Sequence, residues 1–143
     1  MFKKSWVFLL VGLVLGAGVT FVSGALHAAD AKTARVFEIR TYYTLPGRLE
    51  ALQTRFRDHT RRIFEKHGMT NVGYWVPQDS PARENTLIYI ISHASREQAK
   101  ANWAAFIADP EWKKVAEESQ KDGKIIEKID SVFMDATDYS PIK

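Results

Sequence analysis

The sequence contains no cysteine, and its few histidines are scattered. Without cysteine the chain cannot form disulfides, thiolate zinc sites, c-type haem attachments or a lipoprotein anchor. The histidines beyond the N-terminal segment, His59, His67 and His93, are not at metal-ligand spacing. His67 is better placed to cap the end of a helix than to act as a lone axial haem ligand. We therefore predict no metal and no cofactor.

Motifs of nucleotide binding and nucleophilic catalysis are also missing. The chain has no Gly-rich phosphate loop and no Gly-x-Ser-x-Gly motif, and no nucleophile–base pair can be recognised in it. What it does have is an amino-terminal segment with the composition of an export signal. Two lysines precede an apolar run, residues 6–22, and small residues follow at 23–29.

We predict a signal peptide over residues 1–28, with cleavage after Ala28 and Ala25 as the second choice, and an exported protein that is periplasmic or secreted. The alternative is an uncleaved membrane anchor, because the run is at the short edge of the roughly 17–25 residues that span a bilayer. Cleavage removes two lysines and lowers the formal charge from +3 to +1. With so small a charge, the basic pI of the whole chain is no evidence for nucleic-acid binding, and we predict no nucleic-acid partner.

The remaining chain divides into a linker (29–35), one domain (36–135) and a C-terminal tail (136–143). Hydrophobic periodicity in the domain predicts the order β-α-β-β-α-β. We expect strands near 35–43, 70–76, 86–92 and 124–135, and helices over 48–67, 95–108 and 111–121.

Local signals support these boundaries. Ser95 with Gln98 forms a capping box, and Asp109 followed by Pro110 suits the start of a helix. For the helix that Ser95 opens we expect a buried stripe of Ala99, Trp103, Phe106 and Ile107. For the last strand we expect the apolar anchors Ile125, Ile129, Val132 and Phe133.

The element order is that of a ferredoxin-like α+β fold, a four-stranded antiparallel sheet with both helices on one face. The run Leu87–Ile91 is apolar on both faces of its strand, so the face without helices also needs cover. Leaving it in water costs roughly 25 cal/mol per Å² of apolar area. A second copy is the simplest cover, which predicts a homodimeric α+β barrel.

The first strand carries the most suggestive polar residues. Alternation places Glu38, Arg40 and Tyr42 on one side of the strand, away from Phe37 and Ile39. In one interpretation Arg40 holds an anionic or carbonyl group of a ligand, Glu38 orients it, and Tyr42 donates a hydrogen bond. In the other, Glu38 and Arg40 form an ion pair across strands or at the dimer interface, which fixes register.

Other residues are weaker candidates. Trp75 and Trp103 are candidate walls of a ligand pocket, although tryptophans at such spacing are more often core residues. His93, at the end of a strand, is the best candidate for a general base if there is a reaction, with Tyr42 beside it. Asn102, next to Trp103, is expected to be exposed to solvent.

Several of these segments together resemble the NIPSNAP family. They are Phe37–Tyr42 followed by Pro46-Gly47, then Gly73–Trp75, Asn85, and Asp109–Trp112. The resemblance implies the dimeric α+β barrel superfold, which also includes cofactor-free monooxygenases, haem-degrading enzymes and muconolactone isomerase-like proteins. NIPSNAP proteins have no established reaction.

Three functions remain open at this stage. The first is a non-catalytic module that binds a small ligand or a protein partner. The second is a cofactor-independent monooxygenase or isomerase acting on a small aromatic or carbonyl compound, which rests on analogy of fold. The third is a membrane-tethered structural module, if the N-terminal segment stays attached. The sequence does not decide whether the protein is an enzyme.

Overall fold

The computed structural model describes residues 35–143. The export signal and its alternative, the membrane anchor, lie outside this range and remain predictions. Within the range, helices are too short or too polar for any of them to traverse a bilayer.

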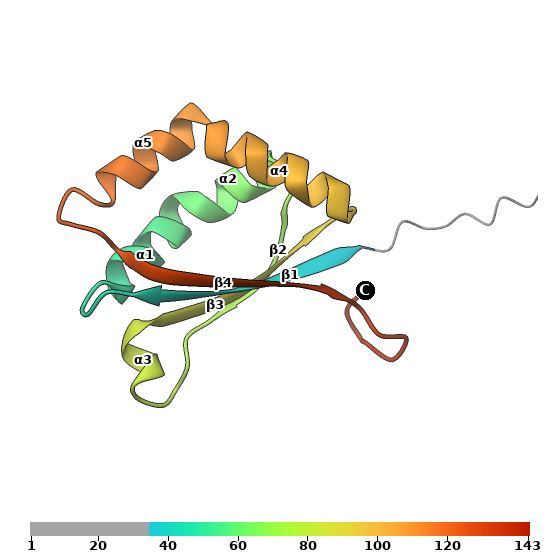
Figure 1. The fold of residues 1–143 in the computed structure, drawn as a ribbon, viewed down its shortest axis with the longest axis horizontal. Helices are drawn as coiled ribbons and strands as arrows, with labels where there is room; N and C mark the ends of the chain where they lie inside the picture. Colours follow the sequence, from blue (N-terminus) through green and yellow to red (C-terminus); the bar gives the residue numbers. More distant parts are fainter. Residues whose placement is uncertain (1–34) are drawn as a thin grey trace, which may run out of the picture. The chain divides into compact units, whose positions relative to one another are not determined.

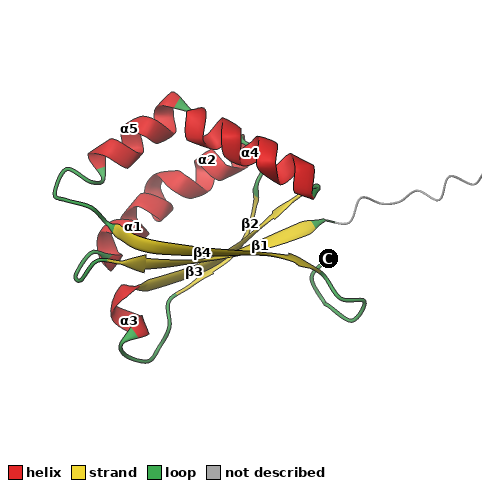
Figure 2. Cartoon of the chain, in the orientation of Figure 1, coloured by secondary structure: helices red, strands yellow, loops and turns green. Residues whose placement is uncertain are grey.

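The described residues form a four-stranded antiparallel sheet with most of the helices on one side (Figure 1). The strands are β1 (Val36–Thr44), β2 (Thr70–Trp75), β3 (Thr86–His93) and β4 (Ile126–Asp135). The helical segments are α1 (Leu49–Arg55), the π-helical η1 (Phe56–Thr60), α2 (Arg61–Lys66), α3 (Ala82–Asn85), α4 (Arg96–Ala108) and α5 (Pro110–Glu118). The sheet order is β2-β3-β1-β4. This confirms the predicted ferredoxin-like α+β fold, and Figure 2 shows the helical layer above the sheet.

The helix predicted over 48–67 is interrupted by the π-helical turn of η1. Thr60 Oγ1 donates a hydrogen bond to the Arg55 carbonyl at 3.1 Å, which spans the wider turn. The segment 77–85, expected to be a loop, contains the single-turn helix α3. Neither feature has a signal in hydrophobic periodicity, because each involves only one turn of backbone.

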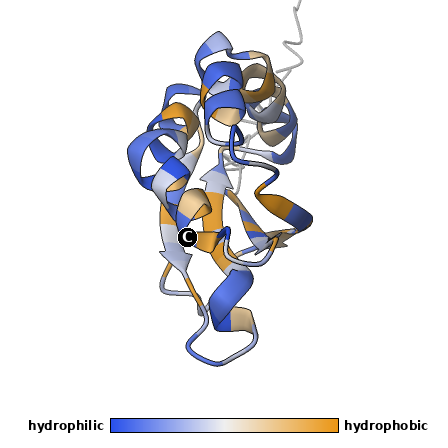
Figure 3. Ribbon diagram, turned by 90° about the vertical axis from the view of Figure 1, so that its left-hand side faces the viewer, coloured by the Kyte–Doolittle hydropathy of each residue, from blue (hydrophilic) through white to orange (hydrophobic). Residues whose placement is uncertain are grey.

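The core lies between the sheet and the helices and is largely aromatic. Tyr89 of β3 is fully buried and packs against Tyr42, Phe56, Phe64 and Tyr74, with ring centroids 5.1–5.9 Å apart. Figure 3 shows the hydrophobic residues along the strands and the hydrophilic ones over much of the helices. Arg40 of β1 lies opposite Tyr89 in the register, on the helix side of the sheet. Because side chains alternate along a strand, Glu38 and Tyr42 point toward the helices as well.

The predicted helix caps are present, but one residue of the buried stripe is wrong. Ser95 accepts a hydrogen bond from the Gln98 N–H at 3.0 Å, and Asp109 accepts one from the Glu111 N–H at 2.8 Å. Ile107 is 61% exposed. Ile107 directly follows the buried Phe106, and the rotation of the helix by one residue turns the Ile107 side chain toward solvent. Asn102, which was predicted to be exposed, is buried instead.

The face of the sheet without long helices is apolar and only partly covered. Register pairs Ile39 of β1 with Ile90 of β3 and with Val132 of β4, so the three side chains share this face. Val132 is 57% exposed and Trp75, at the other edge, is 51% exposed. The C-terminal tail loops beneath one end of this face (Figure 1).

Two of the anchors expected in the last strand are exposed within this chain. Ile129 is 40% exposed on the helix side, and Val132 lies on the open side. Ile125, just before β4, is completely buried, as expected. Because β4 is an edge strand, its side chains have a neighbouring strand on one side only.

Candidate functional site

A buried carboxylate is the centre of the candidate site. Glu38 of β1 is inaccessible to solvent and accepts four side-chain hydrogen bonds. Its Oε1 accepts from Arg40 Nη1 at 2.7 Å and from Ser131 Oγ at 2.6 Å. Its Oε2 accepts from Trp103 Nε1 at 2.7 Å and from His93 Nε2 at 3.3 Å. The carboxylate thus joins β1, β3, β4 and α4.

These contacts set the charge of Glu38. Burial alone would raise its pKa, but the hydrogen bonds from His93, Ser131, Trp103 and Arg40 outweigh burial and lower the pKa to about 2. Glu38 is therefore ionised at neutral pH. A carboxylate so fully bonded is a poor proton acceptor and serves instead to fix the groups around it.

Arg40 is held between Glu38 and an aromatic surface. Its guanidinium carbon lies 4.3 Å from the centre of the Trp103 ring and 5.6 Å from that of Tyr42. Burial opposes the charge, but the nearby hydroxyls and Glu38 raise the pKa of Arg40 above its usual range. Its Nε is buried without a hydrogen-bond partner. Arg40 therefore has donor capacity that this chain does not use.

A cavity of about 390 Å³ lies beside Trp103, lined also by Arg96, Glu97, Lys100 and Phe133. Its wall combines aromatic rings with three charged side chains of α4, of which two are basic and one is acidic. The Arg96 guanidinium covers the Phe133 ring at 3.2 Å from its centre. A planar ligand with an acidic or carbonyl group matches this combination.

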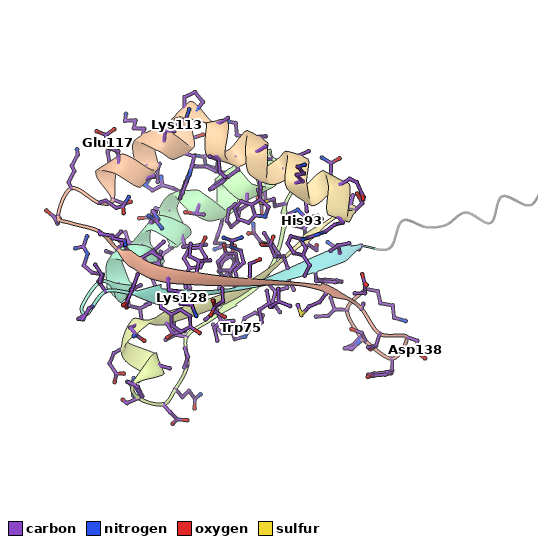
Figure 4. All side chains as sticks on the ribbon, in the orientation of Figure 1. Trp75, His93, Lys113, Glu117, Lys128 and Asp138 are labelled. Carbon is purple, nitrogen blue, oxygen red and sulfur yellow. The ribbon has the colours of Figure 1, made fainter. Side chains whose placement is uncertain are left out.

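His93 lies behind this site. Its place at the end of a strand had suggested a position at the lip of the sheet, but it is not found there. It is buried, on the helix side of the sheet (Figure 4). Nε2 faces the ionised Glu38 and therefore carries the hydrogen, whereas Nδ1 is 3.4 Å from Asn102 Nδ2. Asn102 Nδ2 also donates to the Gly68 carbonyl at 3.1 Å, so this amide nitrogen faces His93. Both ring nitrogens are thus engaged by protein groups.

The structure brings together three of the five predicted ligand-binding residues. Glu38, Arg40 and Trp103 are in direct contact. Tyr42 is buried in the aromatic core, where its hydroxyl accepts from Tyr89 at 3.1 Å. Trp75 projects from the opposite side of the sheet, so it cannot share a wall with Trp103 (Figure 4).

Glu38 and Arg40 form the ion pair of the second interpretation, at 2.7 Å, but within β1 and not across strands. The pair lies beneath α4, on the helix side of the sheet. Sequence reasoning did not find Ser131. The register between β1 and β4, which places Ser131 opposite Arg40, would have indicated this contact.

Among residues 35–143, no cluster of three acidic, histidine or cysteine side chains could hold a metal ion. His67 ends α2, as predicted, and its Nε2 is 2.6 Å from Asp109 Oδ2. His59 is exposed on η1.

Comparisons with known proteins agree with the fold. The family model that matches is NIPSNAP, over residues 37–141. A NIPSNAP family protein with unknown function from Agrobacterium tumefaciens is 25% identical, with a TM-score of 0.67 over 78% of this chain and 96% of that chain. A NIPSNAP-like domain protein from Burkholderia xenovorans is 16% identical, with a TM-score of 0.66 over 76% of this chain and 90% of that one.

A more distant fold likeness is to SnoaB, a cofactor-independent oxygenase from Streptomyces nogalater. The two are 11% identical, with a TM-score of 0.50 over 76% of this chain and 98% of that chain. None of the curated proteins matches significantly.

Proposed function

The chain belongs to the NIPSNAP family, and we propose that it is an exported, homodimeric α+β barrel that binds a small ligand without changing it chemically. The ligand occupies the cavity beside Trp103 and presents an anionic or carbonyl oxygen to Arg40. Its planar part packs against Trp103 and Phe133.

The observation that carries this proposal is the arrangement around Glu38. Its four hydrogen bonds fix Arg40 and Trp103 in one geometry before any ligand arrives. Preorganisation of this kind lowers the entropic cost of binding. Arg40 stacks on the Trp103 ring that lines the cavity, and the cations Arg96 and Lys100 outnumber the acidic Glu97 in its wall.

Binding is favoured over proton transfer because the two buried candidate bases, Glu38 and His93, have their acceptor atoms engaged by protein groups. Glu38 is saturated with donors, and His93 donates to Glu38 while accepting from Asn102. A general base must reach the proton that it removes, directly or through one water. His93 would have to break both contacts to do so.

We expect a change at Arg40 to weaken binding of a carbonyl compound. Benzamide, titrated into the full chain by calorimetry, should bind at least tenfold more weakly to Arg40→Gln than to the wild type, because the charge-assisted hydrogen bond is lost. Arg57→Gln is the matched control, since the Arg57 side chain is 58% exposed on η1. Equal affinities of the wild type and Arg40→Gln would contradict the proposal.

A cofactor-independent oxygenase or isomerase is the second candidate. It is supported by the tryptophan-lined cavity and by the fold likeness to SnoaB, which concerns the fold alone. Oxygen uptake or isomer formation with small phenols and quinols, lost in Trp103→Phe, would favour it over simple binding.

A further inference from the structure

Arg96, the first residue of α4, lies where two cavities meet. It lines the cavity of about 390 Å³ beside Trp103 and also a second cavity of about 190 Å³. Phe133 of β4 lines both cavities as well. The remaining wall of the smaller cavity is formed by Val36, Met134 and Asp135. The pair of Arg96 and Phe133 therefore separates the two spaces.

The guanidinium of Arg96 covers the Phe133 ring, with its carbon 3.2 Å from the ring centre. Among residues 35–143, no carboxylate lies within ion-pair distance of this guanidinium. The Arg96 side chain is exposed, and a cation stacked on an aromatic ring is held only weakly at an exposed site. A ligand can therefore displace Arg96 from the ring.

The proposed ligand requires the part of Phe133 that Arg96 covers. Arg96 and Phe133 line the cavity together, so a planar group that packs against Phe133 meets the guanidinium first. When Arg96 turns away, the ring becomes accessible and the two cavities become continuous. The displaced guanidinium then needs a new partner.

Charge balance indicates what that partner is. Arg40 is paired with Glu38 at 2.7 Å, so a neutral carbonyl oxygen of the ligand is sufficient for it. Arg96 has no counter-charge among the described residues, and a carboxylate matches the planar fork of its guanidinium. Glu97 in the wall of the larger cavity and Asp135 in that of the smaller one repel an anion, which favours its position at Arg96 between them.

We infer that Arg96 is a gate that selects an aromatic carboxylic acid. The guanidinium covers Phe133 until the ring of the ligand takes its place, and it then pairs with the carboxylate of the ligand. The inference rests on the proposed ligand site and names the class of ligand: an aromatic acid whose second polar group is a neutral carbonyl.

The test compares benzamide with two benzamides that carry an acid. Benzamide, 3-carbamoylbenzoate and 4-carbamoylbenzoate are titrated into the full chain by calorimetry at pH 7 and constant ionic strength. The two acids offer two spacings between carbonyl and carboxylate. We expect the tighter-binding acid to bind the wild type at least tenfold more tightly than benzamide does, because it gains charge-assisted hydrogen bonds from Arg96.

Arg96→Gln distinguishes a gate from a structural role, because the two kinds of probe should respond differently. The acid should lose its preference, whereas benzamide should bind the variant at least as tightly as the wild type, since the guanidinium no longer covers Phe133. A general loss of structure would weaken both. Lys100→Gln is the matched control: Lys100 is exposed and lines the larger cavity but not the smaller one, and this variant should keep at least a fivefold preference for the acid.

The results that overturn the gate differ from those that overturn the ligand site. If the wild type binds benzamide and the acids equally, the inference is wrong and the proposed function stands. An acid preference that survives in Arg96→Gln, or that falls as far in Lys100→Gln, also overturns the inference, because the overall charge of the wall then explains it. If Arg96→Gln does not fold, Arg96→Ala replaces it, since alanine is the best helix former. If no probe binds the wild type, the proposed function falls together with the inference.

Discussion

At the residue scale, the four hydrogen bonds to Glu38 connect stability to the ligand site. Replacing the carboxylate by an amide leaves the Arg40 charge buried without a partner and turns one oxygen acceptor into a donor that faces other donors. We expect Glu38→Gln to lower the free energy of unfolding at pH 7 by about 3 kcal/mol. Urea unfolding followed by circular dichroism measures this.

The same substitution also tests how the stabilisation by Glu38 depends on pH. The pKa of Glu38 is about 2 in the folded chain and roughly 4.3 in an unfolded one. The unfolded chain therefore binds the proton more readily, so the stabilisation is complete above about pH 4.5 and is lost as the pH falls toward 2. The gap in stability between the wild type and Glu38→Gln should narrow over this range.

Glu50→Gln is the matched control, because the Glu50 side chain is 73% exposed and its ion pair with Arg57 is long, at 3.7 Å. It should stay within about 0.5 kcal/mol of the wild type at every pH. A gap for Glu38→Gln that does not change with pH would show that packing, and not the ionised carboxylate, accounts for the effect.

Alternation along one strand was enough to find Glu38 and Arg40 from the sequence, because a period of two is a local property. Arg96 and Ser131 were not found. Their roles depend on which way a helix rotates and on how two strands align, and both are settled by packing between distant segments. That Trp75 and Trp103 lie on opposite sides of the sheet could not be predicted for the same reason, since residue type does not show which face a side chain occupies.

At the element scale, Asp109 joins the helices. It caps α5 and accepts from His67 Nε2 at 2.6 Å and Lys66 Nζ at 2.8 Å, both at the end of α2. Hydrogen bonds from Lys66 and His67 hold the pKa of Asp109 well below its usual range. The Asp-Pro signal predicted the cap, because capping is local, whereas the link to α2 was not predicted.

Two substitutions at Asp109 separate these roles. Asn is a good capping residue, so Asp109→Asn should keep the cap and lose the ionic contacts with α2, whereas Asp109→Ala loses both. We expect Ala to lower the free energy of unfolding by about 1 kcal/mol more than Asn, measured by urea unfolding. If the two variants are equally stable, the cap contributes nothing beyond the link to α2.

At the scale of the whole molecule, the open face of the sheet is the surface on which the proposed assembly rests. The tail packs over Phe37 at one end and leaves a cavity of about 280 Å³ there, lined by Ile90, Met134 and Ile142 among others. Across the rest of the face, Trp75 and Val132 remain half exposed. The sequence predicted this face from the apolar run of β3, because a strand that is apolar on both sides must be covered twice.

The proposed homodimer follows from that face and is tested there. We expect the protein to run as a dimer in sedimentation velocity. Val132→Lys should make it monomeric, since a lysine within a dry sheet-to-sheet contact would be buried without a partner. Ile107→Lys is the control: Ile107 is as exposed as Val132 but lies on α4, on the helix side, and its replacement should leave the dimer intact. A wild type that stays monomeric at high concentration, or a dimer unchanged by Val132→Lys, would mean that the apolar face is covered in another way, and the barrel would no longer describe this protein.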